Sequence, residues 1–332
     1  MATFITPYDI ANRTCQHLGV PRITSFSDSS KQAVECGFLY DKLRRSELEK
    51  SVWSFAVRRA VLRKIVVGTS KLLTPAAWAT GTTYAIFDVV KYDNQYWISN
   101  QASNVGNTPG VGGLAPPWSL YNGALIAQAY DAATAYIPGD LLFVTTTAYI
   151  NSAAVTGTGP PNTTYWQPMT GSVATFLFHS PIGYPKNPGT VRNIYRLPAN
   201  FLRVAPMDPK VAGNTRLNTT AGMAYNDFEF EGDYMLSAYQ GSTSQADPLV
   251  MRFVADFTDV PTMETLFCEA LAARMAIELA ETLTQSKDKK NSMIALYDNA
   301  VAVAKMVNAI EAGTTEPEPN TSTAQPQDRG NG

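Results

Sequence analysis

The feature that most constrains this chain is an internal repeat between Pro75 and Gly171. When the stretch is shifted by 52 positions it lies on itself, so that Tyr84 falls on Tyr136 and Asp88 on Asp140. Self-similarity at a fixed period is typical of repeated structural units. Because the repeat lies inside the chain, the segments before and after it are expected to fold together around it.

Each copy of the repeat has the pattern of a small all-β unit. An aromatic residue is followed by Thr-x-Tyr, two short strands, a loop rich in Gly, Pro and Asn, and a closing aromatic residue. The aromatic side chains either build the core of a unit too small to fold without them, or stack on the flat faces of sugars. The candidate glycan-binding residues are Trp78, Trp97, Trp118, Tyr149 and Trp166.

The segments outside the repeat contain helical patterns at both ends of the chain. Residues 7–19 predict a short helix with Pro7 in its first turn and Gly19 as its stop. The stretch Leu39–Lys64 has no Pro or Gly and apolar residues at helical spacing, which predicts one long helix that begins near Ser29 and Ser30. Its apolar face requires partners, and the long helices that can supply them lie at the far end of the chain.

Two further helices are predicted there. The stretch Thr262–Thr284 is apolar almost all round, which predicts burial between helices or between subunits. A second helix follows Ser286 and runs to about Ala312. The predicted strands before them are Thr175–Phe178, Asn193–Pro198, Phe201–Val204, a hairpin of Tyr225–Glu231 with Tyr234–Tyr239, and Leu249–Phe257.

These elements predict an α+β fold: a helical bundle with β-hairpins and a small sheet region, interrupted by an inserted pair of small all-β modules. The predicted domains are a discontinuous core of residues 1–75 plus 172–312, and an insertion of residues 76–171 that divides at about 76–123 and 124–171. Residues 313–332 form a tail whose composition predicts disorder unless it is bound.

Charge limits the classes of ligand. The net charge of −2 argues against a general nucleic-acid binder. Between Glu49 and Asp88, however, all charged residues are basic. These residues are either a solvated surface or a face toward phosphate or an acidic protein. Arg58, Arg59 and Arg63 are the candidates for contact with DNA or with a protein partner.

Patterns typical of catalysis are missing from the sequence. His17 and His179 have no neighbours at metal-ligand spacing, and no HExxH, GxSxG, GxGxxG or P-loop motif occurs. The acidic cluster Asp227, Glu229, Glu231 and Asp233 is best explained as the exposed face of a hairpin. Cys15, Cys36 and Cys268 predict buried free thiols. We therefore expect a non-enzyme without metal or cofactor, soluble, made in the cytoplasm and not inserted in a membrane.

Several segments resemble the head–tail adaptor family of short-tailed bacteriophages, also called tail tubular protein A. The resemblance lies in the stretch around Trp53-Ser-Phe-Ala56, in Tyr195-Arg-Leu-Pro198 with Phe201-Leu-Arg-Val204, and in the C-terminal helices. It covers roughly residues 1–75 and 172–312. The inserted repeats are similar to the small chitin- or cellulose-binding modules of bacterial glycosidases, which the adaptor family does not require.

The resemblance implies a virion protein at the head–tail junction. It implies a ring of twelve identical subunits between the portal protein and the tail nozzle protein, with double-stranded DNA passing through without sequence specificity. The insertion would project outward and decorate the tail or bind a surface glycan. Two alternatives stay open: a secreted or surface glycan-binding protein, and a tail nozzle or fibre subunit.

Overall fold

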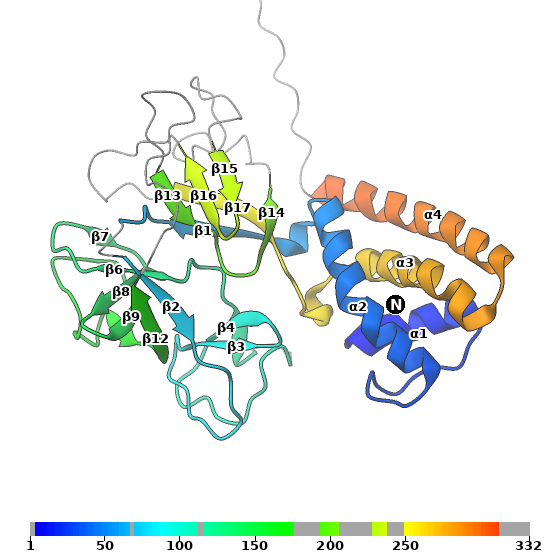
Figure 1. The fold of residues 1–332 in the computed structure, drawn as a ribbon, viewed down its shortest axis with the longest axis horizontal. Helices are drawn as coiled ribbons and strands as arrows, with labels where there is room; N and C mark the ends of the chain where they lie inside the picture. Colours follow the sequence, from blue (N-terminus) through cyan, green and yellow to red (C-terminus); the bar gives the residue numbers. More distant parts are fainter. Residues whose placement is uncertain are drawn as a thin grey trace, which may run out of the picture.

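The computed structural model describes residues 4–66, 70–111, 116–175, 193–205, 228–237 and 249–311. Figure 1 shows the helices gathered at one end of the molecule and the strands at the other. The protein is thus α+β, as predicted. The predicted tail 313–332, His179 and Asp227 lie outside the described residues, as does most of the predicted strand Thr175–Phe178.

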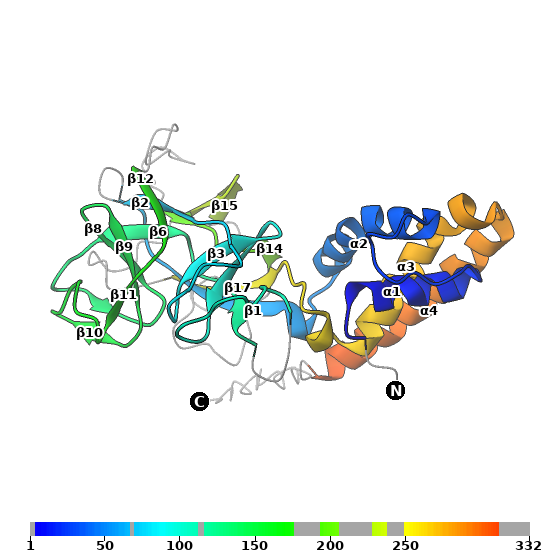
Figure 2. The same ribbon diagram turned by 90° about the horizontal axis from the view of Figure 1, so that it is seen from below.

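The helical end is a bundle of four helices: α1 (Pro7–Leu18), α2 (Lys31–Lys50), α3 (Thr265–Thr284) and α4 (Lys287–Glu311). Helix α3 is central, because α1, α2 and α4 all pack against it. Figure 2 shows this arrangement from below. The nearly all-round apolar sequence of α3 is therefore covered by helices of the same chain. Of the two predicted surroundings, burial between helices is the one that the structure shows.

The helix ends follow the predicted signals. Gly19 ends α1 in the left-handed conformation, with φ of 72°, and its N–H bonds to the last carbonyls of the helix. At the start of α2 the Ser30 hydroxyl accepts a hydrogen bond from the Ala33 N–H at 3.3 Å. Of the two predicted caps, Ser30 is thus the one in use.

The single helix predicted over Leu39–Lys64 is wrong in its second half. Helix α2 ends at Lys50, a short 3-10 turn spans Ser54–Ala56, and β1 covers Val57–Leu62. The buried Trp53 lies at the break, and its indole N–H donates to the Glu47 carbonyl at 3.0 Å. The residues after the break include the β-branched Val57 and Val61, which suit a strand that pairs with β17.

The core next to the bundle is a β-sandwich of two three-stranded sheets. One sheet has the order β1-β17-β14, with β17 at Leu249–Ala255 and β14 at Phe201–Val204. The other has the order β13-β16-β15, from Asn193–Arg196, Tyr234–Ser237 and Phe228–Glu231. Both pack on one cluster that includes Leu62, Tyr195, Met235, Met251 and Phe253. The predicted hairpin is β15–β16, with its turn at Gly232 and Asp233.

The repeats form two modules with matching strands. The first is the sheet β3-β4-β5, at Val89–Tyr92, Gln95–Ser99 and Trp118–Leu120. The second places β8 (Leu141–Val144), β9 (Thr147–Asn151) and β11 (Trp166–Pro168) in the same antiparallel order. Val89 pairs with Ile98 as Leu141 pairs with Ile150, so the register repeats with the sequence. A short ladder of β7 (Ala135–Tyr136) and β10 (Val155–Thr156) completes the second module.

Both modules are packed against the core as well as joined to it. Strand β2 (Lys71–Pro75) pairs with β12 (Gly171–Thr175), and these two strands contain the predicted boundaries of the insertion. They continue through β6 (Ile126–Ala129) into the sheet of the second module. One hydrophobic cluster joins the two modules to Ala199 of the core. The insertion therefore shares a core with its neighbours and does not hang from its ends alone.

Candidate functional site

Three of the five predicted glycan-binding residues are core residues of the modules. Trp97, Trp118 and Trp166 are 4%, 3% and 0% exposed. Trp118 packs edge-on against Tyr84 with ring centroids 5.2 Å apart, and Trp166 packs in the same way against Tyr136 at 5.2 Å. A buried ring offers no face to a sugar, so the prediction of binding platforms is wrong for these three.

The other two aromatic candidates are half-buried. Trp78 packs edge-on against Tyr92 at 5.3 Å, and Tyr149 packs against the cluster around Tyr136 and Trp166. Neither presents a fully exposed ring. The repeat is therefore explained by the aromatic core that each module needs, which was the structural alternative for these residues.

The tyrosine and aspartate of each repeat are also structural. The Tyr84 hydroxyl accepts the Ala79 N–H at 2.7 Å, and the Tyr136 hydroxyl accepts the Asp131 N–H at 2.8 Å. In the same way the carboxylates of the two repeated aspartates accept backbone N–H groups at 2.8 Å, from Ala85 for Asp88 and from Ile137 for Asp140. These bonds close the loop that enters each module.

The prediction that Arg63 contacts DNA or the portal is wrong. Its guanidinium forms a two-pronged ion pair with Asp140, with Nε–Oδ1 at 2.8 Å and Nη2–Oδ2 at 2.6 Å. Both side chains are buried, and the guanidinium also lies over the Tyr136 ring. A planar guanidinium matches a carboxylate in this way. Arg63 therefore fastens the second module to the core.

The neighbouring arginines differ from each other. Arg58 is partly buried: it donates to the carbonyls of Phe55 and Val57 at 2.8 Å and lies over the Phe257 ring. Arg59 points to the opposite face of β1 and is exposed. Of the three predicted arginines, only Arg59 thus presents its charge to solvent.

The strand register places two further arginines beside Arg59. Arg59 and Arg252 are directly opposite each other on β1 and β17, and Arg203 on β14 is opposite Val254, two residues along the same face. Opposite residues of an antiparallel pair share a face. This cluster was not predicted from the sequence, because it depends on pairing between distant strands. The alternation Phe201-Leu-Arg-Val204 was the available signal.

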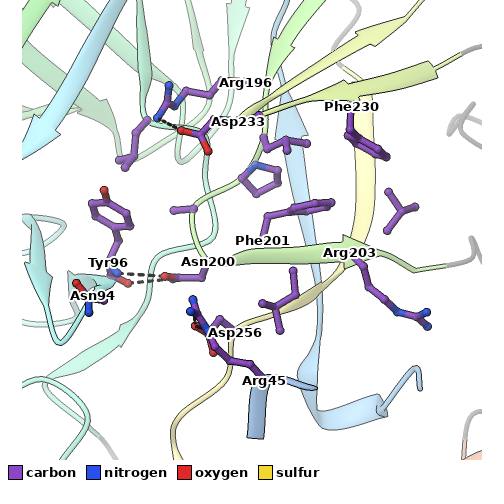
Figure 3. A pocket seen from close by; sticks show the side chains of 17 residues that line it. Arg45, Asn94, Tyr96, Arg196, Asn200, Phe201, Arg203, Phe230, Asp233 and Asp256 are labelled. Atoms are coloured by element: carbon purple, nitrogen blue, oxygen red, sulfur yellow. Dashed lines mark hydrogen bonds and ion pairs between the residues drawn. The ribbon is translucent and has the colours of Figure 1, made fainter. Parts of the chain in front are cut away.

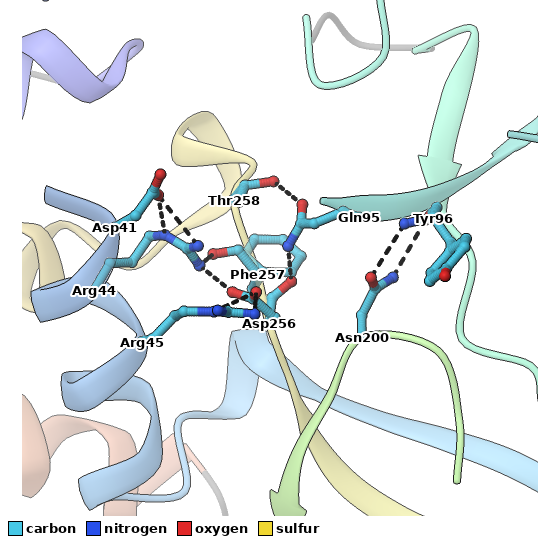
Figure 4. A network of polar contacts seen from close by, with 9 residues as sticks. All are labelled: Asp41, Arg44, Arg45, Gln95, Tyr96, Asn200, Asp256, Phe257 and Thr258. Carbon is cyan, nitrogen blue, oxygen red and sulfur yellow. Dashed lines mark hydrogen bonds and ion pairs between the residues drawn. The ribbon is translucent and has the colours of Figure 1, made fainter. Parts of the chain in front are cut away.

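A buried polar junction connects the bundle, the sandwich and the first module (Figure 4). At its centre Asp256 accepts bonds from Arg44 and Arg45, each at 2.7 Å. The Asp256 carbonyl accepts from Gln95 of β4. Beside it, the Asn200 amide bonds to the backbone of Tyr96 and of Tyr121 at 2.9–3.2 Å. Since buried charges need such partners, the junction holds three regions in one arrangement.

A groove of about 610 Å³ lies next to this junction, between α2, the β4 end of the first module and β14 (Figure 3). One part of its lining is apolar and aromatic, with Phe201, Phe230 and Leu197. The lining also carries three arginines: Arg196 lies beside Asp233, and Arg45 and Arg203 lie on the side away from Phe230. This groove was not predicted, because its residues come from distant parts of the sequence.

Helix α4 has a second apolar face that the described part of the chain does not cover. It packs on α3 through residues such as Met293 and Ala304, while Ile294, Val303, Met306 and Ile310 are 39–66% exposed. By length and composition the segment Lys287–Ile310 could also cross a membrane. A single helix of this kind is weak evidence for a membrane span, because packed helices of soluble proteins can have the same length and apolar composition.

The titratable groups of the described residues show no arrangement typical of catalysis. No group of three or more His, Cys, Asp or Glu that could hold a metal occurs in that part of the chain. The three cysteines are free and buried, as predicted, with burial raising the pKa of Cys268 to about 12. Burial lowers the pKa of His17, with Arg13 adding to the shift and Glu269 opposing it.

Comparison with known proteins adds no assignment. A scan against protein-family models and a search of curated proteins return no match for this chain.

Proposed function

We propose that this protein is a structural subunit of a head–tail junction in a short-tailed bacteriophage. In this proposal it forms a ring between portal and tail nozzle, and DNA passes through the ring without being read. Two things support this: the family resemblance of residues 1–75 and 172–312, and the exposed apolar and basic surfaces of the described residues. The virion location and the portal and nozzle partners come from the resemblance alone.

The observation that carries the proposal is the uncovered face of α4. Ala302, Val303, Met306 and Ile310 lie within about one third of the helix circumference, on the side away from α3. The charged residues Asp298 and Lys305 lie along one side of this stripe and outside it. Contiguous exposed apolar surface is typical of protein–protein interfaces. Helix α3, in contrast, is already covered and is not available for subunit contact.

The exposed Arg59 agrees with a DNA passage that is not sequence-specific. The strand register places Arg59 opposite Arg252, so positively charged side chains gather on this face of the sheet. Phosphate contacts by arginine position a protein on DNA without reading bases. The net charge of −2 shows that any such contact is local.

The proposal is tested by electron microscopy of the purified chain mixed with the portal of the same phage. We expect a ring stacked on the portal for the natural chain. Met306→Glu places a charge in the α4 stripe and is expected to abolish the ring. Asn291→Glu adds the same charge at the polar, N-terminal end of the same helix and is expected to leave the ring intact.

Circular dichroism must show that both variants fold, since exposed substitutions change stability by only about 0.5 kcal/mol. Rings of Met306→Glu as abundant as those of the natural chain would contradict the role of α4. Absence of portal binding, together with retention of the chain on chitin or cellulose, would favour the glycan-binding alternative instead.

A further inference from the structure

The outer edge of β14 has no strand paired with it in the described part of the chain. The sheet order β1-β17-β14 makes β14 an edge strand, and the groove of Figure 3 runs along that edge from Pro198 to Val204. The Ala205 N–H bonds to the Arg252 carbonyl at 3.0 Å, so Arg203 sits at a bonded position and Val204 directs its peptide groups outward. Such an edge is a template for an added strand.

The two sides of the groove differ in chemistry. Phe201 packs against Phe230 with centroids 5.7 Å apart, and Phe230 is 40% exposed, which leaves an aromatic wall on one face of the edge. Arg203 points to the opposite face, because a register shift between Phe201 and Arg203 pairs them with the adjacent residues Ala255 and Val254 of β17. An added strand would therefore meet apolar surface with one set of side chains and arginines with the other.

The arginines of the groove are incompletely neutralised. The Nε of Arg203 is buried and makes no hydrogen bond to the described residues. Arg196 pairs at 3.4 Å with Asp233, whose side chain is 76% exposed. Arg45 pairs with Asp256, but Arg44 shares that carboxylate. The lining thus has excess positive charge, and it suits an occupant that carries carboxylates.

We propose that the groove binds residues Glu316–Pro319 from the tail of a second copy of this chain. The sequence Glu316-Pro-Glu-Pro319 alternates acidic residues with prolines. A residue before proline favours an extended backbone. The two prolines are two residues apart, so in an extended segment the positions without an N–H group both lie along the same edge. The N–H groups of the two glutamates lie along the other edge, where they can pair with β14.

The side chains fit the two walls of the groove. In an extended segment Glu316 and Glu318 point to one face and the prolines to the other. The carboxylates then meet Arg203 and its neighbours, while the prolines lie against Phe201 and Phe230. Four extended residues span about 13 Å, which is the length of β14.

The place where α4 ends makes this segment available to a neighbour. Asn308 ties the end of α4 to the start of the sandwich by bonding to the Val52 carbonyl at 2.7 Å and the Ser54 N–H at 2.8 Å. The tail therefore starts at the border of bundle and sandwich. That a neighbouring copy receives it rests on the proposed ring, in which copies stand side by side.

The experiment measures binding of a labelled synthetic peptide with the sequence of residues 312–323. The receptor is the full chain carrying Glu316→Gln and Glu318→Gln, which weakens competition from its own tail. We expect saturable binding that weakens as salt rises. Adding Arg203→Ala should weaken it about tenfold or more, since a charged hydrogen-bond partner is lost. Arg22→Ala, on an exposed arginine far from the groove, should leave it unchanged.

A second arm changes only the peptide, so its result does not depend on the folding of a variant. A peptide with Glu-Glu-Pro-Pro in place of Glu-Pro-Glu-Pro has the same charge and composition but loses the alternation. We expect it to bind at least tenfold more weakly. Equal binding of this peptide, or of an unrelated acidic peptide, would overturn the proposal, as would an unchanged affinity of Arg203→Ala.

Two further outcomes identify other occupants. If the peptide binds the Glu→Gln receptor but does not bind the natural chain as a monomer, the chain's own tail fills the groove. The assignment of the groove to the tail of a second copy is then overturned. If the peptide does not bind but the natural chain still forms a ring on the portal, this inference fails and the proposed function stands.

Discussion

Asp88 and Asp140 occupy the same position in the two modules, yet their surroundings differ. Both accept a backbone N–H, but only Asp140 receives the guanidinium of Arg63. Burial raises the pKa of Asp88, partly offset by bonds from the backbone N–H groups of Ala85 and Thr170. A repeated carboxylate thus has a local role in both modules and an additional role, attachment to the core, in one.

This difference predicts unequal effects of the same substitution. Asp140→Asn removes the carboxylate charge that pairs with the buried Arg63 guanidinium and should lower the free energy of unfolding by about 3–5 kcal/mol. Asp88→Asn keeps an acceptor for the Ala85 N–H and should cost about 1 kcal/mol. Urea denaturation of both variants measures the difference. Equal losses would show that the ion pair contributes nothing beyond the loop bond.

His17 predicts a pH dependence of stability. Its pKa in the folded chain is below the ordinary value of 6.5, chiefly because of burial. The unfolded chain therefore takes up a proton first as pH falls, and stability is lost between pH 6.5 and the lower folded pKa. Above pH 6.5 the imidazole is neutral in both states and contributes no pH dependence.

His17→Gln should remove this part of the loss. The measurement is the free energy of unfolding at pH 7.5 and pH 5.5 for the natural chain and the variant. The natural chain should lose more stability over this interval than His17→Gln. An identical slope in both would contradict the assignment, because carboxylates contribute equally to the two proteins.

At the scale of elements, α2 and β1 show how helical spacing misleads. The stretch Leu39–Lys64 has helical periodicity throughout, but Val57–Leu62 pairs with six residues of β17 that are nearly 200 positions away. Burial of Ala60 and Leu62 in the sandwich outweighs the weak helical preference of these residues. The start of α2, in contrast, depends on a local signal and was predicted correctly.

That local signal gives a matched pair of substitutions. Ser30→Ala removes the hydroxyl that accepts the Ala33 N–H and should lower the free energy of unfolding by about 1 kcal/mol. Ser29→Ala, one residue earlier, should change it by less than about 0.5 kcal/mol. Thermal and urea denaturation of both variants provide the comparison. A larger loss for Ser29→Ala would show that the helix begins elsewhere.

At the scale of the whole molecule, the junction around Asp256 and Asn200 makes bundle, sandwich and first module one unit. Asn200 has φ of 59°, a left-handed conformation that asparagine tolerates, and its amide bonds to Tyr96 and Tyr121 of the first module. The insertion is therefore positioned by a few polar contacts besides its shared hydrophobic cluster.

Asn200→Gly keeps the backbone conformation and removes these bonds, so it isolates their effect. We expect a loss of about 2–4 kcal/mol and faster hydrogen exchange at Tyr96 and Tyr121. Asn200→Ala should cost about 1–2 kcal/mol more, because alanine resists the left-handed conformation. Unchanged exchange in the first module for both variants would show that its position depends on hydrophobic contacts alone.

The sequence by itself determined the features that depend on neighbours along the chain. These are the repeat with its two short strands in each copy, the helix start near Ser29 and Ser30, the stop at Gly19, the hairpin at Gly232, and the apolar character of α3 and α4. It predicted the α+β class from the same local patterns, because periodicity and turn residues act over a few positions.

The tertiary structure alone decided what depends on distant pairing. It turned Val57–Leu62 into a strand, buried Trp97, Trp118 and Trp166, joined Arg63 to Asp140 across 77 positions, and placed Arg203 beside a groove. Whether an aromatic or arginine side chain is buried in the core, forms an ion pair between two regions or is exposed to solvent depends on which distant residues pack against it. That is set by the packing of the whole chain, and a local pattern does not contain it.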